Sequence, residues 1–134
     1  MILNPGIVEQ MIAHAEREAP VEACGYLLGA RNRITRHVPM TNTDHSEDHF
    51  TFDPAAQFAV AKAARKDGLT LTGIYHSHPS SPARPSAEDV KLAFDPALVY
   101  VIISLMNGTK TVKGFHIRQG TVEAEHLIIE EEHK

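Results

Sequence analysis

Two histidines separated by a single residue are the part of the sequence best suited to chemistry. His76 and His78 lie at the end of the stretch GIYHSH, which has the composition of a β-strand, and Pro79 follows them. Because side chains alternate across a strand, both imidazoles are expected on the same side, where two neutral rings can bind one metal ion. A His-x-His pair is also common on exposed strands that bind no metal, and the two interpretations are about equally supported, so the pair alone does not establish a metal site.

A serine and an aspartate follow the histidines at a spacing that could complete such a site. Ser86 comes after a proline and precedes a short helical stretch, and Asp89 lies one helical turn later on the same face. If this turn folds back toward the strand end, Asp89 becomes a third ligand, and three protein ligands are typical of catalytic zinc. The alternative is structural: Ser86 is a helix N-cap and Asp89 a first-turn acid.

A zinc-bound water needs a base, and Glu22 is the best placed carboxylate. Glu22 begins the predicted strand EACGYLLG, just after Pro20. A carboxylate beside a zinc-bound water is the arrangement that metalloproteases use. Ser86 could then donate a hydrogen bond to the oxyanion of a tetrahedral intermediate. On its own, Glu22 would be interpreted as an ordinary surface charge.

The surrounding sequence predicts helices and strands that could bring these residues together. Proline and glycine mark the boundaries, and hydrophobic spacing gives the type of each element. The order α-β-β-α-β-α-β-β-β indicates an α/β sandwich with a mixed sheet. The predicted helices cover 4–19, about 53–67 and 86–94; the strands cover 22–30, 34–40, 69–78, 97–105, 111–119 and 121–129; and 41–53 and 79–85 are loops, the first with room for a short edge strand.

The two longer helices are predicted to bury one face each. In the first, apolar residues recur at helical spacing and His14 falls on the opposite, polar face. In the second, the predicted face consists of Ala55, Phe58, Ala59, Lys62 and Ala63. The apolar strand 97–105 is expected to be buried on both sides.

The composition is that of an ordinary globular domain. The chain has 134 residues, 43% hydrophobic and 22% charged, and is predicted to form a single domain over residues 1–134. A formal charge of −4 argues against nucleic acid as the main partner. The N-terminus has no signal-peptide pattern, and the apolar run 97–103 is too short to cross a bilayer. We therefore expect a cytoplasmic protein without membrane contact.

The single cysteine and the remaining histidines receive simpler interpretations. Cys24 excludes an intrachain disulfide and a four-cysteine zinc site; it could be a nucleophile, but a strand cysteine is more often a buried small residue. His45 and His49 could contact substrate or a second metal, although solvated loop histidines are favoured. No functional role is predicted for His14, His37, His116, His126 and His133.

The five candidate residues together resemble the JAMM motif of the JAB/MPN family of zinc-dependent isopeptidases. That motif has an upstream glutamate, His-(Ser/Thr)-His-Pro, six residues, a serine, two residues and an aspartate. Here it is Glu22 followed by HSHP, SSPARP, S, AE and D, with no member missing. The segments PVEACGYLLG and NTDHSEDHFTFDP are also similar to the family, so the resemblance spans about residues 1–118.

The resemblance implies a fold, an activity and a partner. The family fold is a curved mixed β-sheet flanked by helices, a cytidine-deaminase-like sandwich. Members cleave amide or isopeptide bonds after the C-terminal glycine of ubiquitin and its relatives, and prokaryotic members act on ubiquitin-like sulfur carriers or small modifiers. By this resemblance the chain is a compact prokaryotic metalloprotease, and its partner is a ubiquitin-like or sulfur-carrier protein with a Gly-Gly tail.

The resemblance also assigns roles residue by residue. His76, His78 and Asp89 would bind one Zn²⁺ per chain. Glu22 would act as general base and acid, and Ser86 would help to stabilise the oxyanion.

Where the substrate binds and whether the protein is an enzyme are separate questions. The substrate tail is expected to add as a strand beside the 41–53 segment or the loop after Pro79. A non-catalytic scaffold of the same fold is the alternative, but such members typically lack some of the ligands that are all present here. A zinc deaminase would need a Pro-Cys-x-x-Cys motif, which a chain with one cysteine cannot supply. We therefore predict an enzyme.

Overall fold

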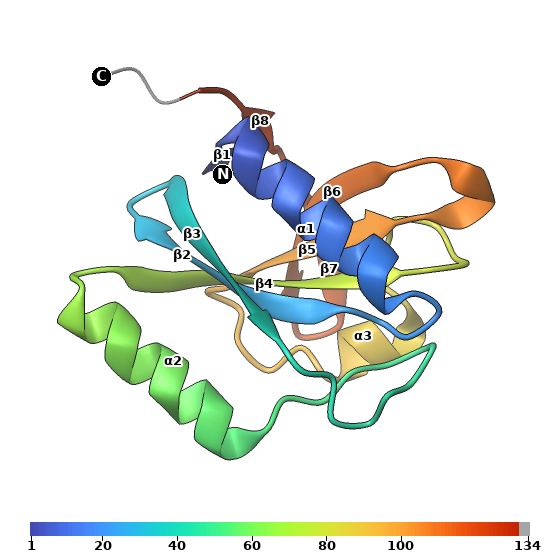
Figure 1. Cartoon of the computed structure of the whole chain (residues 1–134), viewed down its shortest axis with the longest axis horizontal. Helices are drawn as coiled ribbons and strands as arrows, with labels where there is room; N and C mark the ends of the chain where they lie inside the picture. Colours follow the sequence, from blue (N-terminus) through green and yellow to red (C-terminus); the bar gives the residue numbers. More distant parts are fainter. Residues whose placement is uncertain (132–134) are drawn as a thin grey trace.

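The computed structural model describes residues 1–131; residues 132–134, including His133, lie outside the described part of the chain. A single mixed sheet is flanked by helices (Figure 1). The strands are β1 (Ile2–Leu3), β2 (Cys24–Ala30), β3 (Arg33–Met40), β4 (Thr70–His78), β5 (Val99–Ser104), β6 (Thr111–Arg118), β7 (Thr121–Glu125) and β8 (Ile128–Ile129). The helices are α1 (Pro5–Glu18), α2 (Pro54–Lys66) and α3 (Ala87–Lys91), with a 3-10 turn, η1, at Met106–Gly108.

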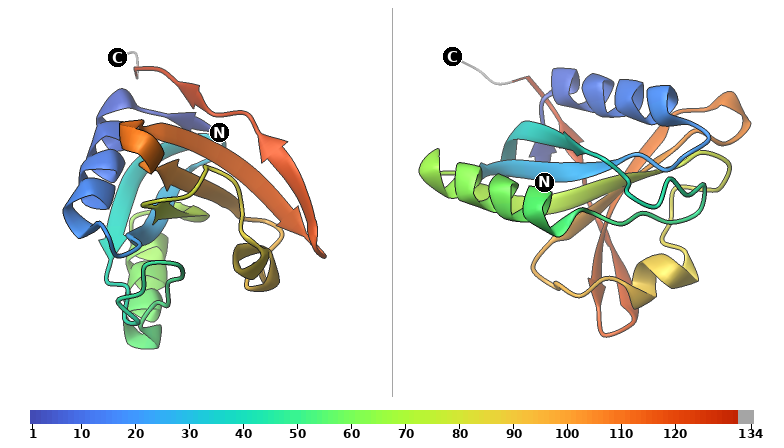
Figure 2. Two further views of the ribbon diagram at one scale, coloured as in Figure 1. Left: turned by 90° about the vertical axis from the view of Figure 1, so that its right-hand side faces the viewer. Right: turned by 60° about the horizontal axis from the view of Figure 1, so that its bottom comes forward.

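The sheet has the order β7-β6-β5-β4-β2-β3-β1-β8. β4 pairs with β2 in antiparallel and with β5 in parallel orientation, so the sheet is mixed. It is strongly curved, and β6 and β7 turn away from the plane of the other strands (Figure 2). The predicted fold class, a curved mixed sheet flanked by helices, is confirmed.

Local signals explain where the two long helices begin. The Asn4 side chain accepts a hydrogen bond from the backbone N–H of Gly6 (2.7 Å), and Asp53 accepts one from that of Ala56 (3.0 Å). Each cap is followed by a proline, which suits the first helical position because no intrahelical N–H is needed there. Both helix starts agree with the sequence prediction.

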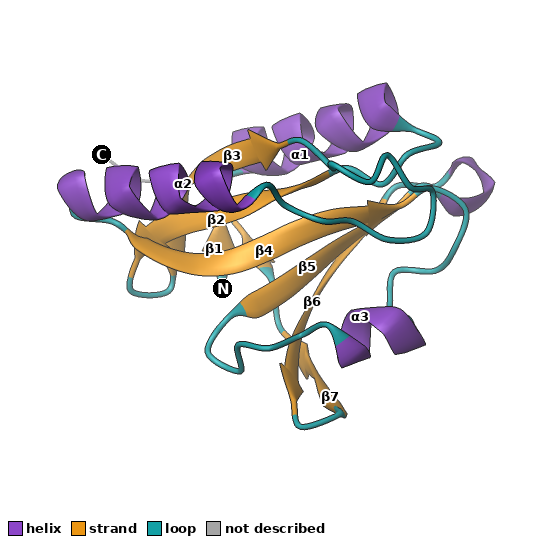
Figure 3. Ribbon diagram, turned by 90° about the horizontal axis from the view of Figure 1, so that it is seen from below, coloured by secondary structure: helices purple, strands orange, loops and turns teal. Residues whose placement is uncertain are grey.

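The alternation of side chains along β4 divides the sheet into two faces. Tyr75 points into a core that α1 covers, together with Leu27 and Val101. Its neighbour Ile74 packs on the opposite face, where α2 lies (Figure 3). β5 is buried along its whole length, as its continuous apolar run predicts.

His76 occupies a fixed register at the centre of the sheet. It lies opposite Cys24 on β2 and opposite Ile102 on β5. Since directly paired residues share a face, the side chain of His76 lies on the face that carries α2 and α3. The sheet thus presents both histidines to one side at the end of its central strand.

The prediction for the two ends of the sheet was wrong. β1 was not foreseen, and the predicted strand 121–129 is broken at residues 126–127. Its last part, β8, leaves β7 and pairs in parallel with β1, whose partner on the other side is β3. A two-residue strand is held by distant partners and has no local pattern of its own.

Two predicted helix faces also need correction. Phe58 is 72% exposed, and α2 packs through Val60 and Ala64 instead. An alanine-rich helix offers several weakly apolar faces, so spacing alone chose the wrong one. His14, expected on the polar face of α1, is buried, and its Nδ1 lies 2.9 Å from the hydroxyl of Tyr75.

The loop 41–53 contains no strand, and β2 begins at Cys24, which leaves Glu22 in the segment before it. Among residues 1–131, no helix is long and apolar enough to span a membrane.

Candidate metal centre and catalytic site

Three side-chain atoms from two elements meet at the end of β4. His76 Nε2 and His78 Nε2 lie 3.1 Å apart, and Asp89 Oδ2 lies 3.1 Å from the first and 3.0 Å from the second. The two histidine side chains are buried and that of Asp89 is 7% exposed. The structure therefore brings together the three residues that the sequence singled out as ligands.

The backbone orients the ring of His78. Its Nδ1 lies 2.8 Å from the carbonyl oxygen of Pro82. A carbonyl can only accept, so Nδ1 carries a proton and Nε2 can present its lone pair to a metal. His76 is oriented by packing, because the Phe50 ring lies against it with a centroid distance of 4.8 Å. Neither partner could be read from the spacing of the motif.

A capping box at the start of α3 aims Asp89 at the histidines. Ser86 Oγ accepts a hydrogen bond from the backbone N–H of Asp89 (3.0 Å), and the backbone N–H of Ser86 donates to Asp89 Oδ2 (2.9 Å). That oxygen is the one that faces both rings. The structural interpretation of these two residues is thus correct, and it is also what holds the third candidate ligand in place.

The charges within this triad support one another. Burial disfavours the Asp89 carboxylate, but hydrogen bonds from His76 and His78 outweigh it and hold the pKa of Asp89 well below its ordinary value. Burial likewise opposes the charged form of His78, and the hydrogen bond to Asp89 reverses this and raises its pKa. Asp89 is therefore a carboxylate. A metal cation bound between the Nε2 atoms of His76 and His78, in place of their protons, would be stabilised by the same negative charge.

The donor set fits one metal ion. Ligands in tetrahedral zinc, with bonds of about 2.0 Å, are roughly 3.3 Å apart, close to the spacing of these three atoms. Two imidazole nitrogens and one carboxylate oxygen would leave a position open. Beside them, Glu22 Oε1 is buried and has no hydrogen-bond partner within residues 1–131, as expected of a group whose partner is a bound water.

Glu22 is almost fully buried beside this cluster. Its exposed fraction is 3%, and burial raises the pKa of its carboxyl group to about 8, with His78 lowering the value and Asp89 raising it. A carboxyl group with such a pKa exchanges its proton near neutral pH, as a general base and acid must. The segment before β2 thus supplies a group with the right chemistry.

Two neighbours fix the backbone around Glu22. Ser77, the residue between the histidines, accepts a hydrogen bond at Oγ from the N–H of Ala23 (2.7 Å) and donates its own N–H to the Ala23 carbonyl (2.9 Å). On the other side, the N–H of Glu22 donates to the carbonyl of Ser46 (2.9 Å). The candidate base is therefore attached both to the candidate metal strand and to the loop 41–53.

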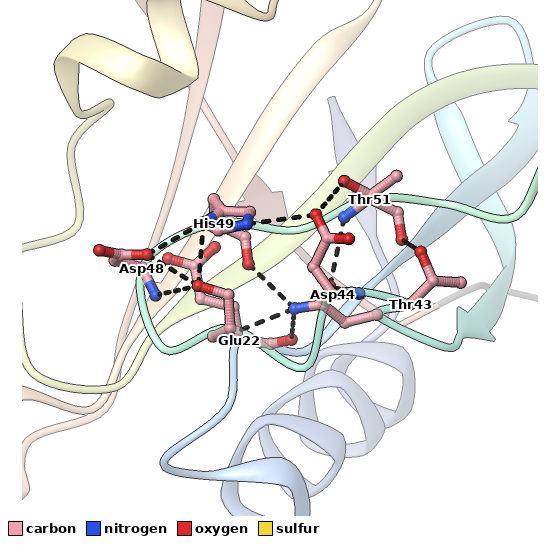
Figure 4. A network of polar contacts seen from close by, with 8 residues as sticks. Glu22, Thr43, Asp44, Asp48, His49 and Thr51 are labelled. Atoms are coloured by element: carbon pink, nitrogen blue, oxygen red, sulfur yellow. Dashed lines mark hydrogen bonds and ion pairs between the residues drawn. The ribbon is translucent and has the colours of Figure 1, made fainter.

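The loop 41–53 is organised by polar contacts rather than by a strand (Figure 4). Asp44 and Asp48 both contact the ring of His49, and Thr51 donates to Asp44 Oδ2 (2.5 Å). Asn42, which the sequence analysis did not single out, is buried at the centre of these contacts. The sequence feature that could have pointed to Asn42 is an asparagine at the start of a polar loop, which is typical of an Asx turn. In the structure Asn42 Oδ1 accepts the N–H of Asp44 (3.2 Å).

An apolar groove of about 330 Å³ adjoins the triad and shares His76 and Asp89 with it. Residues 49–52 form one wall, and Leu92, Phe94 and Leu98 lie on the other side. Its floor is built from strand residues, namely Ile74, Tyr100, Ile102 and Ile117. Phe94 is 83% exposed at the rim. Sequence spacing gave no sign of this groove.

The other candidates are sorted by burial. Cys24 is fully buried in an apolar cluster and lies outside the groove. Burial raises the pKa of its thiol to about 12, which favours the interpretation as a buried small residue over that as a nucleophile. His49 lies in the loop with 35% of its side chain exposed, as a solvated loop histidine would, and it also lines the groove. His45 is exposed and lies beside Glu22 in a small separate cavity.

Comparison with known proteins shows that the chain is similar to one family over most of its length. A family model described as prokaryotic homologues of the JAB domain matches residues 5–117. The chain is 35% identical to the CysO-cysteine peptidase of Mycobacterium tuberculosis, over 99% of this chain and 93% of the relative. It is 39% identical to the probable TtuB-protein conjugate cleaving protease of Thermus thermophilus, over 86% and 74%.

A solved structure is similar over almost the whole length. Protein DSY2949 from Desulfitobacterium hafniense superposes with a TM-score of 0.89 at 44% identity, covering 98% of this chain and 94% of that one. Since the family model covers most of the chain and both relatives are above 30% identity, the family is established. The chain belongs to the prokaryotic JAB-domain family, whose named relatives here are peptidases.

Proposed function

We propose that this protein is a zinc-dependent peptidase that hydrolyses the amide bond after the C-terminal glycine of a ubiquitin-like or sulfur-carrier protein. The observation that carries the proposal is the meeting of His76 Nε2, His78 Nε2 and Asp89 Oδ2 beside the buried carboxyl group of Glu22. The relatives named as a CysO-cysteine peptidase and a TtuB-conjugate protease support the substrate class.

His76, His78 and Asp89 would hold one zinc ion. Zinc suits two imidazole nitrogens and one carboxylate oxygen better than magnesium or calcium, which prefer oxygen ligands. When bound, it would polarise the scissile carbonyl and lower the pKa of its water. Pro82 would keep the His78 ring in the binding tautomer, and the capping box would keep the Asp89 oxygen turned inward.

Glu22 would move the proton. In its ionised form it accepts a proton from the attacking water, and its raised pKa lets it pass that proton to the leaving amine. The hydrogen bonds of its backbone to Ser46 and of Ala23 to Ser77 would hold the carboxyl group at the site during both transfers.

Ser86 would assist the negatively charged intermediate. Its Oγ accepts the N–H of Asp89, which leaves the hydroxyl hydrogen available to donate. Ser86 is exposed and adjoins the triad through Asp89. A donor at this place would stabilise the oxyanion that forms on the substrate carbonyl.

The substrate tail would lie in the apolar groove. Residues 49–52 form one of its walls, which favours the 41–53 segment over the loop after Pro79 as the place where an extended tail pairs. A Gly-Gly end suits the approach to the triad because it carries no side chains. The apolar floor would take bulkier residues further up the tail.

The test is cleavage of a carrier fusion that has an amide bond after its Gly-Gly end, with metal content measured on the same samples. We expect about one zinc per chain, a product ending in glycine by mass spectrometry, loss of cleavage after chelation, and recovery with added zinc. Zinc without cleavage of carrier fusions would contradict the substrate class. Absence of zinc after reconstitution would contradict the metal site.

The groove makes a separate prediction about substrate affinity. Phe94→Ala should raise KM for a carrier substrate about three- to tenfold and leave kcat within a factor of two, because Phe94 lines the groove away from the reacting atoms. Stability should not change, since Phe94 is 83% exposed.

Phe58→Ala is the matched control for this prediction. Phe58 is 72% exposed on α2 and does not line the groove. Equal KM values for the wild type and Phe94→Ala in steady-state kinetics, or equal increases in the two variants, would rule out this groove as the tail site.

A further inference from the structure

A single buried side chain connects the candidate base with the wall of the groove. Asn42 is 6% exposed and lies in the loop 41–53, at the end of β3. Its Nδ2 has two hydrogens and lies within hydrogen-bond distance of three carbonyl groups, of which that of Ser46 is the farthest, and its Oδ1 accepts from two N–H groups. The partners are the carbonyls of Glu22 (3.1 Å), His49 (2.9 Å) and Ser46 (3.4 Å) and the N–H groups of Asp44 (3.2 Å) and Thr51 (3.2 Å).

We infer that Asn42 is a positioning residue for catalysis, which holds Glu22 at the site and ties its position to the groove wall formed by residues 49–52. This inference rests on the proposed function of Glu22 as the base. Asn42 touches none of the three candidate ligand side chains, so its effect would act on the proton transfer and not on metal binding.

The backbone of Glu22 depends on this loop because no strand holds it. β2 begins at Cys24, two residues later. The N–H of Glu22 donates to Ser46, and its carbonyl accepts from Asn42. Both peptide groups that flank the side chain of Glu22 are thus attached to the loop, and Asn42 also bonds to the Ser46 carbonyl.

The Asn42 side chain also holds the backbone on both sides of Phe50, whose ring packs on His76 of the candidate metal site. Asn42 bonds to the carbonyl of His49 and to the N–H of Thr51, which are the neighbours of Phe50. The Phe50 ring lies on the ring of His76 and lines the groove. A substrate tail bound in the groove would therefore contact residues 49–52, whose backbone is hydrogen-bonded to the same Asn42 side chain as the backbone of Glu22.

Few side chains can replace asparagine here. The position needs a donor to carbonyl groups and an acceptor for N–H groups at once, in a place shielded from water. Alanine would remove every one of these bonds and leave the buried carbonyl group of Glu22 without its partner. Aspartate keeps the shape and the acceptor but loses the donor to Glu22 and His49.

The experiment compares Asn42→Ala and Asn42→Asp with Thr43→Ala. Thr43 donates to the carbonyl of Thr51 (3.1 Å) from the exposed side of the same loop and does not contact Glu22. We expect kcat to fall at least tenfold in both Asn42 variants, with KM raised less than kcat is lowered and with wild-type zinc content. Thr43→Ala should keep kcat within a factor of two.

Amide hydrogen exchange gives a readout that does not need cleavage. The N–H of Glu22 should exchange at least tenfold faster in both Asn42 variants, while that of Ser77, which bonds to Ala23, should keep its rate. The N–H groups of Asp44 and Thr51 should lose protection in Asn42→Ala and keep it in Asn42→Asp, because aspartate preserves their acceptor.

The outcomes separate this inference from the proposed function. If the wild type does not cleave carrier fusions, the proposed substrate fails, and the exchange rate of the Glu22 N–H alone decides whether Asn42 holds it. With a cleaving wild type, a kcat within a factor of two in folded Asn42 variants overturns the inference. An unchanged exchange rate at Glu22, or loss of zinc along with activity, overturns it as well.

Discussion

Glu22→Gln is expected to lower kcat by about 10³-fold or more while the protein keeps its fold and its zinc. Glutamine has the same shape as glutamate but cannot accept the proton of the attacking water, and loss of a general base typically costs about 10²–10⁴ in rate. Glu22 is not one of the three proposed metal ligands, which are His76, His78 and Asp89, so metal content should not change. The measurements are steady-state kinetics and metal analysis of the same sample.

The same substitution should stabilise the metal-free protein at alkaline pH. The pKa of Glu22 is about 8 in the folded state and 4.5 ordinarily, because burial disfavours the charged form. The folded state therefore binds this proton more tightly, and its contribution to stability is full below pH 4.5 and is lost as the pH rises toward 8. Glutamine has no proton to lose, so the variant should gain roughly 2–4 kcal/mol at pH 8 and nothing near pH 4.5.

Urea unfolding in the presence of chelator at the two pH values measures this difference. Glu47→Gln is the control, because Glu47 is an exposed carboxylate on the neighbouring loop. A Glu22→Gln variant that is active would remove Glu22 from the mechanism. One that is inactive but no more stable at pH 8 would mean that its carboxyl group is hydrated in the folded protein.

The parts of this site that the sequence predicted are those governed by short-range geometry. His76 and His78 lie on one side because a strand alternates its side chains, and Ser86 and Asp89 meet because they are one helical turn apart. Both rules hold in any fold. Glu22 was chosen by its position at the start of a predicted strand, and the resemblance to the JAMM motif supported that choice, because Glu22 taken alone would be interpreted as a surface charge.

The parts that were missed depend on contacts between distant segments. The carbonyl of Pro82 orients His78, and Asn42 holds Glu22, through atoms whose positions follow only from the complete fold. The pairing of β8 with β1 joins the two ends of the chain and has no local pattern. The face of α2 was misjudged because alanines allow several faces, and the neighbouring strands choose among them.

Asp89→Ala is expected to abolish both zinc binding and cleavage. The substitution removes one of the three proposed ligands together with the acceptor for the Ser86 N–H. The two histidines alone should not retain zinc against a competing chelator, and cleavage should fall by at least 10³-fold, because the other site residues cannot replace what the metal supplies. Zinc content after dialysis against chelator and the cleavage rate measure the two effects.

Asp89→Asn and Ser86→Ala separate the two tasks of this turn. Asparagine preserves an acceptor for the Ser86 N–H but loses the charge that favours a cation, so α3 should stay capped while zinc binding falls. Ser86→Ala removes the hydroxyl that accepts the Asp89 N–H, at a cost of about 0.5–2 kcal/mol, yet leaves the three proposed ligands in place.

If Ser86 also donates to the oxyanion, the alanine variant should keep its zinc and lose about 10²-fold or more in kcat. A Ser86→Ala variant with normal kcat would limit Ser86 to its capping role. An Asp89→Ala variant that keeps its zinc through chelator dialysis would show that the three atoms at the end of β4 meet for a structural reason, because a buried carboxylate between two histidine rings is also a stable ion pair. The comparison of Asp89→Asn with Asp89→Ala therefore decides whether charge or capping makes Asp89 necessary.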